Sequence, residues 1–176
     1  MKKLLWGLAG TLFLAGFAQA TDHGHGRLRM QGEIIDTACA IATGDENQTV
    51  SFGAVPISQL AADGHSVTVP LVIHLINCSL NGTDVQGYDH WKDVHIIFQG
   101  MSRDGQIFTL QGSGRGEALV IRDGKGIMAK PGKALPEGNI EPGTMTLRYE
   151  MQLVVNKEAL HPGDFHTTIR YFMEYE

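Results

Sequence analysis

The chain has 176 residues, a formal net charge of −5 and 22 glycines, but only two cysteines and two tryptophans. This length fits one domain, and the negative charge argues against non-specific binding to nucleic acid. Two cysteines are too few for a disulfide-dense scaffold or for a zinc site built from cysteines alone. Because glycine averages about 7 % of residues, this excess of glycine, which follows no fixed period, indicates many turns and favours an all-β domain.

The first twenty residues have the composition of a secretory signal peptide. Lys2 and Lys3 form a basic start, residues 4–17 are mostly apolar, and Ala18-Gln19-Ala20 matches the small-x-small cleavage pattern. The apolar run is shorter than the roughly 20 residues that span a bilayer, so we expect cleavage rather than anchoring. The sequence therefore predicts an exported protein of residues 21–176, and the short lysine-led leader is typical of a bacterium.

Cys39 and Cys78 both lie in the exported part of the chain, so both are expected to reach an oxidising compartment. Two cysteines allow one intramolecular pairing, and a bridge across this loop would stabilise the fold by about 3–4 kcal/mol. A catalytic thiol or two free thiols are the alternatives. Compartment and count together favour a structural disulfide.

Apolar residues alternate with polar ones along the exported chain, at the period of two that marks half-buried strands. In chain order, the predicted strands cover residues 67–75, 94–98, 107–110, 119–121, 145–153 and 165–175. Asp123-Gly124 and Pro162-Gly163-Asp164 are turn signals between them, and the one plausible helix covers residues 57–62. Turn signals about every ten residues predict a single sandwich of immunoglobulin type.

The two ends of the exported chain are complementary. Residues 21–30 alternate between a small or apolar face, with Gly24, Gly26, Leu28 and Met30, and a polar face with histidine and arginine. The last strand alternates to the penultimate residue, and nothing follows it that could pair with its outer edge. An uncovered apolar edge promotes aggregation unless a partner covers it, so one molecule offers a strand where another lacks one.

Residues 26–39, Gly-Arg-Leu-Arg-Met-Gln-Gly-Glu-Ile-Ile-Asp-Thr-Ala-Cys, resemble the start of chaperone–usher fimbrial subunits (pilins), in which an alternating extension precedes the first cysteine. Residues 73–78, which end at the second cysteine, the glycine-rich stretch 112–121 and the close from Pro162-Gly163-Asp164-Phe165 to Tyr175 resemble the same family. The resemblance covers essentially all of residues 21–176.

This resemblance implies an immunoglobulin-like sandwich that lacks its seventh strand, which another molecule supplies. It divides the chain into a signal peptide (1–20), a donor-strand extension (21–31) and a pilin domain (32–176). The implied partners are a periplasmic chaperone, an outer-membrane usher and neighbouring pilins, and the implied location is a fimbria on the bacterial surface with a role in cell adhesion. No catalytic activity, cofactor, metal or nucleic acid is expected.

The resemblance also assigns roles to individual residues. The donor side chains are those of Gly24, Gly26, Leu28 and Met30. The edge that accepts a strand or contacts the chaperone comprises Phe165, Ile169, Tyr171, Met173, Tyr175 and Glu176.

Within the family, the chain resembles a minor subunit. The early positions of its extension carry Asp22, His23 and His25 instead of an apolar residue. Residues 126–136 and the closing Tyr175-Glu176 resemble the terminating, membrane-proximal subunit of P-type pili. We therefore expect a subunit that stops or anchors the fibre.

Other chemistry is less well supported by the residues. His23 and His25 could hold a metal only loosely, because no thiol or carboxylate stands at a firm ligand spacing. Residues 112–116 mimic a phosphate-binding loop but lack the Lys-Ser/Thr and the helix that should follow, so a turn or bulge is expected there. Tyr88 and Trp91 give the alternative function, a secreted carbohydrate-binding sandwich (a lectin-like adhesin) that stacks sugars on aromatic rings. The competing interpretation is that these aromatic residues anchor a loop to the sandwich.

Overall fold

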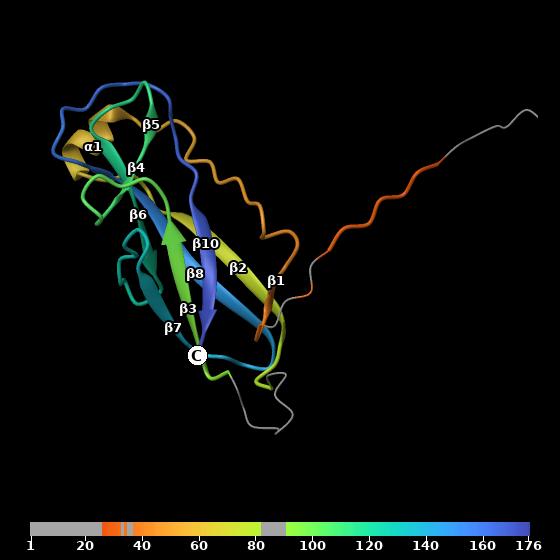
Figure 1. Ribbon diagram of the computed structural model, residues 1–176. Coiled ribbons are helices and arrows are strands. Elements are labelled where there is room, and N and C mark those ends of the chain that lie inside the picture. Colours follow the sequence, from red (N-terminus) through yellow and green to blue (C-terminus); the bar gives the residue numbers. More distant parts are fainter. Residues whose placement is uncertain (1–25, 33, 35–36, 82–90) are drawn as a thin grey trace, which may run out of the picture. The chain divides into compact units, whose positions relative to one another are not determined.

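The computed structural model describes residues 26–32, 34, 37–81 and 91–176 and divides into two units (Figure 1). The unit that ends at Ile34 has no regular secondary structure among its described residues, and the unit that begins at Ile35 is the folded domain. The predicted signal peptide lies outside the described residues, as do residues 21–25 and Tyr88. In the part of the chain that is described, no helix is long and apolar enough to cross a membrane.

The domain is almost entirely β, as predicted. Its elements are β1 (Ala40–Ile41), α1 (Ile57–Asp63), β2 (Val69–Cys78), β3 (Asp93–Gln99), β4 (Phe108–Thr109), β5 (Gln111–Gly112), β6 (Glu117–Asp123), β7 (Ala134–Asn139), β8 (Gly143–Val155), β9 (Phe165–His166) and β10 (Arg170–Tyr175). They form a five-stranded sheet in the order β1-β2-β8-β6-β4, a three-stranded sheet in the order β10-β3-β7, and the separate pair β5-β9.

The core lies between the two larger sheets and follows the predicted alternation. The buried side chains of the long strands are those of Leu71, Ile73 and Leu75 on β2, Val94, Ile96 and Phe98 on β3, and Leu147, Tyr149, Met151 and Leu153 on β8. The rings of Phe98 and Tyr149 meet edge to face between the sheets, with their centroids 5.0 Å apart. Since burial of one such side chain stabilises a fold by about 1.5–3 kcal/mol, this layer holds the two sheets together.

The predicted helix and turn are both present. The helix α1 ends at Gly64, whose left-handed backbone (φ 77°) is the usual end of a helix. In the turn after β6, the Asp123 carboxylate accepts the backbone N–H groups of Lys125 (2.9 Å) and Ile127 (2.7 Å). Both features were visible in the sequence because they depend on residues close together in the chain.

The structure differs from the sequence-based expectation in several strands. The expected last strand, residues 165–175, is interrupted at residues 167–169, because its two parts pair with different strands, β9 with β5 and β10 with β3. The short strands β1 and β5 were not expected. Val67 is 60 % exposed rather than part of the buried face, because β2 begins only at Val69. The strand β7 was not predicted, since its sequence contains a proline and a glycine and does not alternate. It tolerates them because it is an edge strand and because its register with β3 shifts between Val94 and His95.

The glycine-rich stretch 112–116 is a site of close backbone contact. Its first residue, Gly112, ends β5, which pairs with β9. The chain bends at Ser113 and Gly116, in keeping with the expected turn or bulge. Gly112 has a φ of +135°, and a Cβ atom there would lie 2.0 Å from the carbonyl oxygen of Asp164. A Cβ atom on Gly163 would lie 2.3 Å from the backbone nitrogen of Gly114. This contact fixes the segment that leads into the last strand.

Gly112→Ala is therefore expected to destabilise the domain by about 1–3 kcal/mol, from overpacking and from the strained backbone conformation. The matched control is Gly124→Ala, because a Cβ atom at Gly124 meets nothing within 4 Å and its φ is not left-handed. Urea-induced unfolding of both variants gives the comparison. Equal stability of the two variants would contradict the close contact.

Candidate functional site

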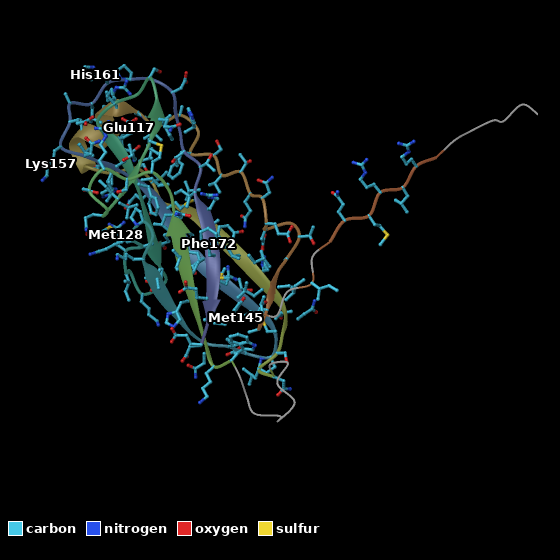
Figure 2. All side chains as sticks on the ribbon, in the orientation of Figure 1. Glu117, Met128, Met145, Lys157, His161 and Phe172 are labelled. Atoms are coloured by element: carbon cyan, nitrogen blue, oxygen red, sulfur yellow. A yellow bond between two sulfur atoms is a disulfide. The ribbon has the colours of Figure 1, made fainter. Side chains whose placement is uncertain are left out.

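The last strand, β10, has an inner face that the domain covers only in part. It lies at the edge of the three-stranded sheet, with β3 on one side. From position 165 to position 175, alternate side chains are half-buried, and those between them are exposed; the half-buried ones are Phe165, Thr167, Ile169, Tyr171, Met173 and Tyr175. Phe172, one of the alternating exposed residues, is 44 % exposed (Figure 2). Since the inward residues at the centres of β2 and β8 are fully buried, part of the cover over β10 is missing from the described chain.

The backbone of β10 also has one edge without a paired strand. Glu176 and Asp93 exchange two backbone hydrogen bonds, each 3.0 Å long. Because antiparallel pairing alternates between hydrogen-bonded and non-hydrogen-bonded residue pairs, the N–H and C=O groups of Tyr171, Met173 and Tyr175 point away from β3. Among the described residues, no strand pairs with this outer edge.

A groove of about 980 Å³ opens beside this edge. Its two rims are residues 46–55 and residues 163–171, and its floor is apolar, formed by Leu71, Phe98, Leu110, Leu119, Ile121, Met151 and Leu153. In Figure 1, the first rim belongs to the chain between β1 and α1, and the second leads into β10. Apart from the half-buried Leu110, these floor side chains are buried, so the groove is a gap between the two rims that reaches down to the core.

The structure brings most of the predicted edge residues to this groove. Phe165, Ile169 and Tyr171 line it, whereas Met173 and Tyr175 lie beyond its end on the same strand. Glu176 continues the pairing with β3, since its carbonyl also accepts the backbone N–H of Lys92 at 2.6 Å.

No pattern in the sequence indicated the opposite rim, residues 46–55. This rim has no strand among its residues, so it carries no periodic pattern. Phe52 is its clearest apolar contact, because its ring meets the ring of Phe165 edge to face, with the centroids 6.2 Å apart.

The donor residues that the structure describes are Gly26, Leu28 and Met30, and Gly24 lies outside the described part. Leu28 and Met30 are 88 % and 87 % exposed in a segment without regular structure. Apolar side chains this exposed have buried almost none of their surface, so their stabilising potential is unused in this chain.

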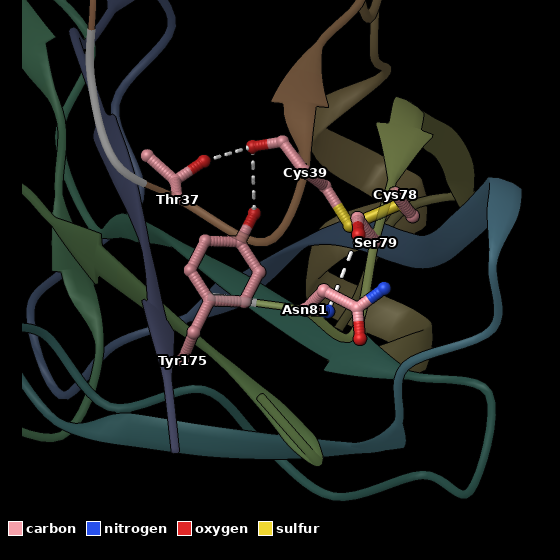
Figure 3. The surroundings of a disulfide bond; sticks show 6 residues. All are labelled: Thr37, Cys39, Cys78, Ser79, Asn81 and Tyr175. Atoms are coloured by element: carbon pink, nitrogen blue, oxygen red, sulfur yellow. Dashed lines mark hydrogen bonds between the residues drawn. A yellow bond between two sulfur atoms is a disulfide. The ribbon is translucent and has the colours of Figure 1, made fainter. Parts of the chain in front are cut away.

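The chain that precedes the first rim is fixed to β2. Cys39 and Cys78 form a disulfide, as predicted, and neither is a free thiol (Figure 3). The Asp45 carboxylate accepts the backbone N–H of His74 at 2.6 Å and lies 2.7 Å from the Nδ1 atom of the same residue. These bonds, the backbone one above all, hold the pKa of Asp45 below its usual range. Gln48 adds a hydrogen bond from its Nε2 atom to the carbonyl of Val72 at 2.9 Å.

Trp91 lies in the domain as an anchor. It is half-buried, and its ring meets that of Tyr175 edge to face with the centroids 6.0 Å apart. This packing favours the loop-anchor interpretation over an exposed platform for sugars. The described residues contain no group of three or more His, Cys, Asp or Glu side chains that could hold a metal ion.

Comparison with known proteins decides the family. Residues 28–176 match the family model described as fimbrial protein. The chain belongs to the fimbrial protein family. This pilin is 31 % identical over 172 residues to the major MR/P fimbria protein of Proteus mirabilis (strain HI4320). The aligned residues cover 95 % of this chain and 93 % of that protein. It is 27 % identical over 154 residues to the PRS fimbrial minor pilin protein of Escherichia coli, covering 86 % of this chain and 77 % of that protein.

Solved structures show the same fold. The P pilus rod subunit PapA superimposes with a TM-score of 0.70 at 22 % identity, over 80 % of this chain and all of that one. A chain from the structure of a chaperone–usher pilus gives a TM-score of 0.76 at 22 % identity, over 90 % of this pilin and all of that chain. The pilin is thus a structural subunit of a surface fimbria rather than an enzyme, with the immunoglobulin-like sandwich expected from its sequence.

The contact between Asp45 and His74 predicts how the stability of this pilin changes in acid. Because the pKa of Asp45 is lowered in the folded state, its contribution is fully present above the ordinary pKa of about 3.9 and is lost as the pH falls through the folded-state value. Asp45→Asn should lower the melting temperature at neutral pH and should flatten its decline below about pH 4. Glu46→Gln, which removes a neighbouring exposed carboxylate, is the control. Parallel profiles for Asp45→Asn and the wild type would contradict this role.

Proposed function

We propose that this pilin is assembled by donor-strand exchange, in which a strand from a neighbouring subunit completes its domain. The observation that carries the proposal is the outer edge of β10, which has no paired strand in the described chain and lies beside an apolar groove. A strand inserted there would pair with the backbone of Tyr171, Met173 and Tyr175 and would place alternate side chains on the groove floor. A slip of one residue would turn every apolar side chain away from the floor, so the register would be well defined.

The N-terminal extension has the properties of such a strand. Its apolar residues, Leu28 and Met30, alternate with Arg27 and Arg29, and both apolar side chains are exposed. In the groove of another subunit, these apolar residues would be buried while the arginines faced solvent. Each subunit would then give one strand and receive one, which builds a linear fibre.

Before assembly, the same groove needs a different cover. An open apolar edge in a periplasm crowded with subunits would promote aggregation. We infer that a periplasmic chaperone covers it with a strand of its own and binds the carboxylate end of the chain at Glu176, where β10 ends in an exposed side chain. An outer-membrane usher would then receive the complex, and the finished fimbria would serve cell adhesion.

A finer role, that of a minor subunit that ends or anchors the fibre, is a second form of the proposal: in that role the pilin gives its extension to a neighbour but exchanges no neighbour's strand into its own groove. Its support is the polar start of the extension at Asp22, His23 and His25, together with the similarity to the PRS fimbrial minor pilin protein. An extension without an early apolar residue would fill the first part of a neighbour's groove poorly, which suits a subunit used once per fibre better than one repeated along its shaft.

Donor-strand complementation is tested by adding a second copy of residues 21–31 after Glu176 through a short flexible linker. This fused chain should be monomeric and soluble, and burial of Leu28 and Met30 should raise its free energy of unfolding by roughly 3–6 kcal/mol. The matched control is the same fusion with Leu28→Ser and Met30→Ser in the added copy. If the unfused chain is already monomeric and equally stable, the proposal is wrong, and a self-complete binding domain such as a lectin is favoured.

The terminating role has its own test. The pilin is purified with its chaperone bound and is then incubated with a peptide that matches the extension of a sibling subunit from the same fimbria. We expect little release of the chaperone over hours, measured by size-exclusion chromatography, because a terminating subunit accepts no following strand. Efficient release would overturn the terminating role and leave donor-strand assembly intact.

A further inference from the structure

Two tyrosine hydroxyls on β10 reach across to the Cys39–Asp45 segment, the chain that precedes the first rim of the groove. The Tyr171 hydroxyl donates to the backbone carbonyl of Asp45, and the Tyr175 hydroxyl donates to the backbone carbonyl of Cys39 at 3.3 Å. Figure 3 shows the Tyr175 ring directed at the Cys39 carbonyl, close to the disulfide. Both side chains belong to the half-buried inner face of β10, so their hydrogen bonds pass beneath the strand edge and leave its N–H and C=O groups free to pair.

The carbonyl groups that accept these bonds are themselves attached to β2. Cys39 is bonded through its disulfide to Cys78, the last residue of β2. Asp45 is attached through its carboxylate to His74 in the same strand. Each tyrosine therefore links the three-stranded sheet, to which β10 belongs, to a fixed point on the five-stranded sheet.

The cavity ends where these links begin. Its lining includes Phe165, Ile169 and Tyr171 but neither Met173 nor Tyr175. The acceptor site thus has an open part, between residues 46–55 and 163–171, and a tied part, where the tyrosine hydroxyls join β10 to the Cys39–Asp45 segment.

Both hydroxyls are suited to a permanent role as donors. Burial raises the pKa of Tyr175 to about 12, and burial together with the nearby Asp45 charge raises the pKa of Tyr171. Each phenol therefore keeps its proton throughout the physiological range, and the two links do not depend on pH there.

We propose that Tyr171 and Tyr175 are positioning residues that hold β10 and the Cys39–Asp45 segment apart by the width of one missing strand before that strand arrives. A strand placed between two others needs two strand spacings, roughly 9.6 Å in total. Walls already held at this spacing need less ordering when the strand binds, which raises affinity without any new contact. This inference rests on the proposed donor-strand function and deepens it by naming the residues that preorganise the acceptor.

The test uses Tyr171→Phe, Tyr175→Phe and the double variant in the mature chain, residues 21–176. Each change keeps the ring and removes only the hydroxyl. The control is Phe172→Leu, which alters an exposed side chain on the opposite face of β10 between the two tyrosines without touching either link. The probe is an excess of a synthetic peptide of residues 21–34, and its binding is followed by the fluorescence of Trp91, the one tryptophan that remains after residue 20.

We expect each tyrosine variant to bind the peptide on the order of two- to tenfold more weakly, the range set by the net contribution of one hydrogen bond. Phe172→Leu should bind like the wild type. Amide hydrogen exchange over residues 39–45 should be faster in the empty tyrosine variants and should return to the wild-type rate when peptide saturates them. A loss of general stability would instead speed exchange throughout the domain, and not over residues 39–45 alone.

Unchanged or tighter peptide binding by the tyrosine variants would overturn the proposal, because tighter binding would mean that the links must break to admit a strand. If the wild type does not bind the peptide, donor-strand pairing with this extension is wrong. Amide hydrogen exchange in the chains without peptide then still tests the role of the two tyrosines. Equal exchange over residues 39–45 in wild type and tyrosine variants would then overturn it.

Discussion

The outer edge of β10 is the constraint on which the rest of this pilin depends. Backbone N–H and C=O groups need partners when they are buried, and those of Tyr171, Met173 and Tyr175 face an edge with no paired strand in the described chain. The inner side of the same strand is only half-buried and adjoins a groove whose floor is the core itself. One added strand would pair the edge, cover the inner face and fill the groove. The unpaired edge, the half-buried face and the groove therefore all indicate the same missing strand.

Sequence alternation was sufficient to predict the parts of this fold that repeat every second residue. It located β2, β8 and the face shared by Phe165 and Tyr175, and the cysteine count predicted the disulfide. It could not predict the rim at residues 46–55, whose irregular backbone has no period, or the contact of Gly112 with Asp164, whose residues are far apart in the chain. The tyrosine hydroxyls were predicted to lie on the acceptor strand, but their bonds to the opposite wall depend on the folded arrangement.

Both walls of the acceptor site, the segment that begins at Cys39 and the segment that ends in β10, are attached to the rest of the domain. The disulfide and the contact between Asp45 and His74 hold the first wall on β2, and the tyrosine hydroxyls connect that wall to β10. The close backbone contact between β5 and β9 holds the other end of the second wall. A scaffold fixed at these points can leave a strand-sized gap open without collapsing into it, which a subunit that waits for a strand requires.

The most direct measurement of the central claim is residue-resolved amide hydrogen exchange along β10, in the isolated chain and in assembled fimbriae. In the isolated chain, the amides of Phe172 and Glu174, which face β3, should exchange slowly, whereas those of Tyr171, Met173 and Tyr175 should exchange rapidly. In the fimbria, all five should be protected, because a second strand then pairs with the outer edge. Protection of the amides of Tyr171, Met173 and Tyr175 in the isolated, monomeric chain would show that the domain completes itself and would contradict the account.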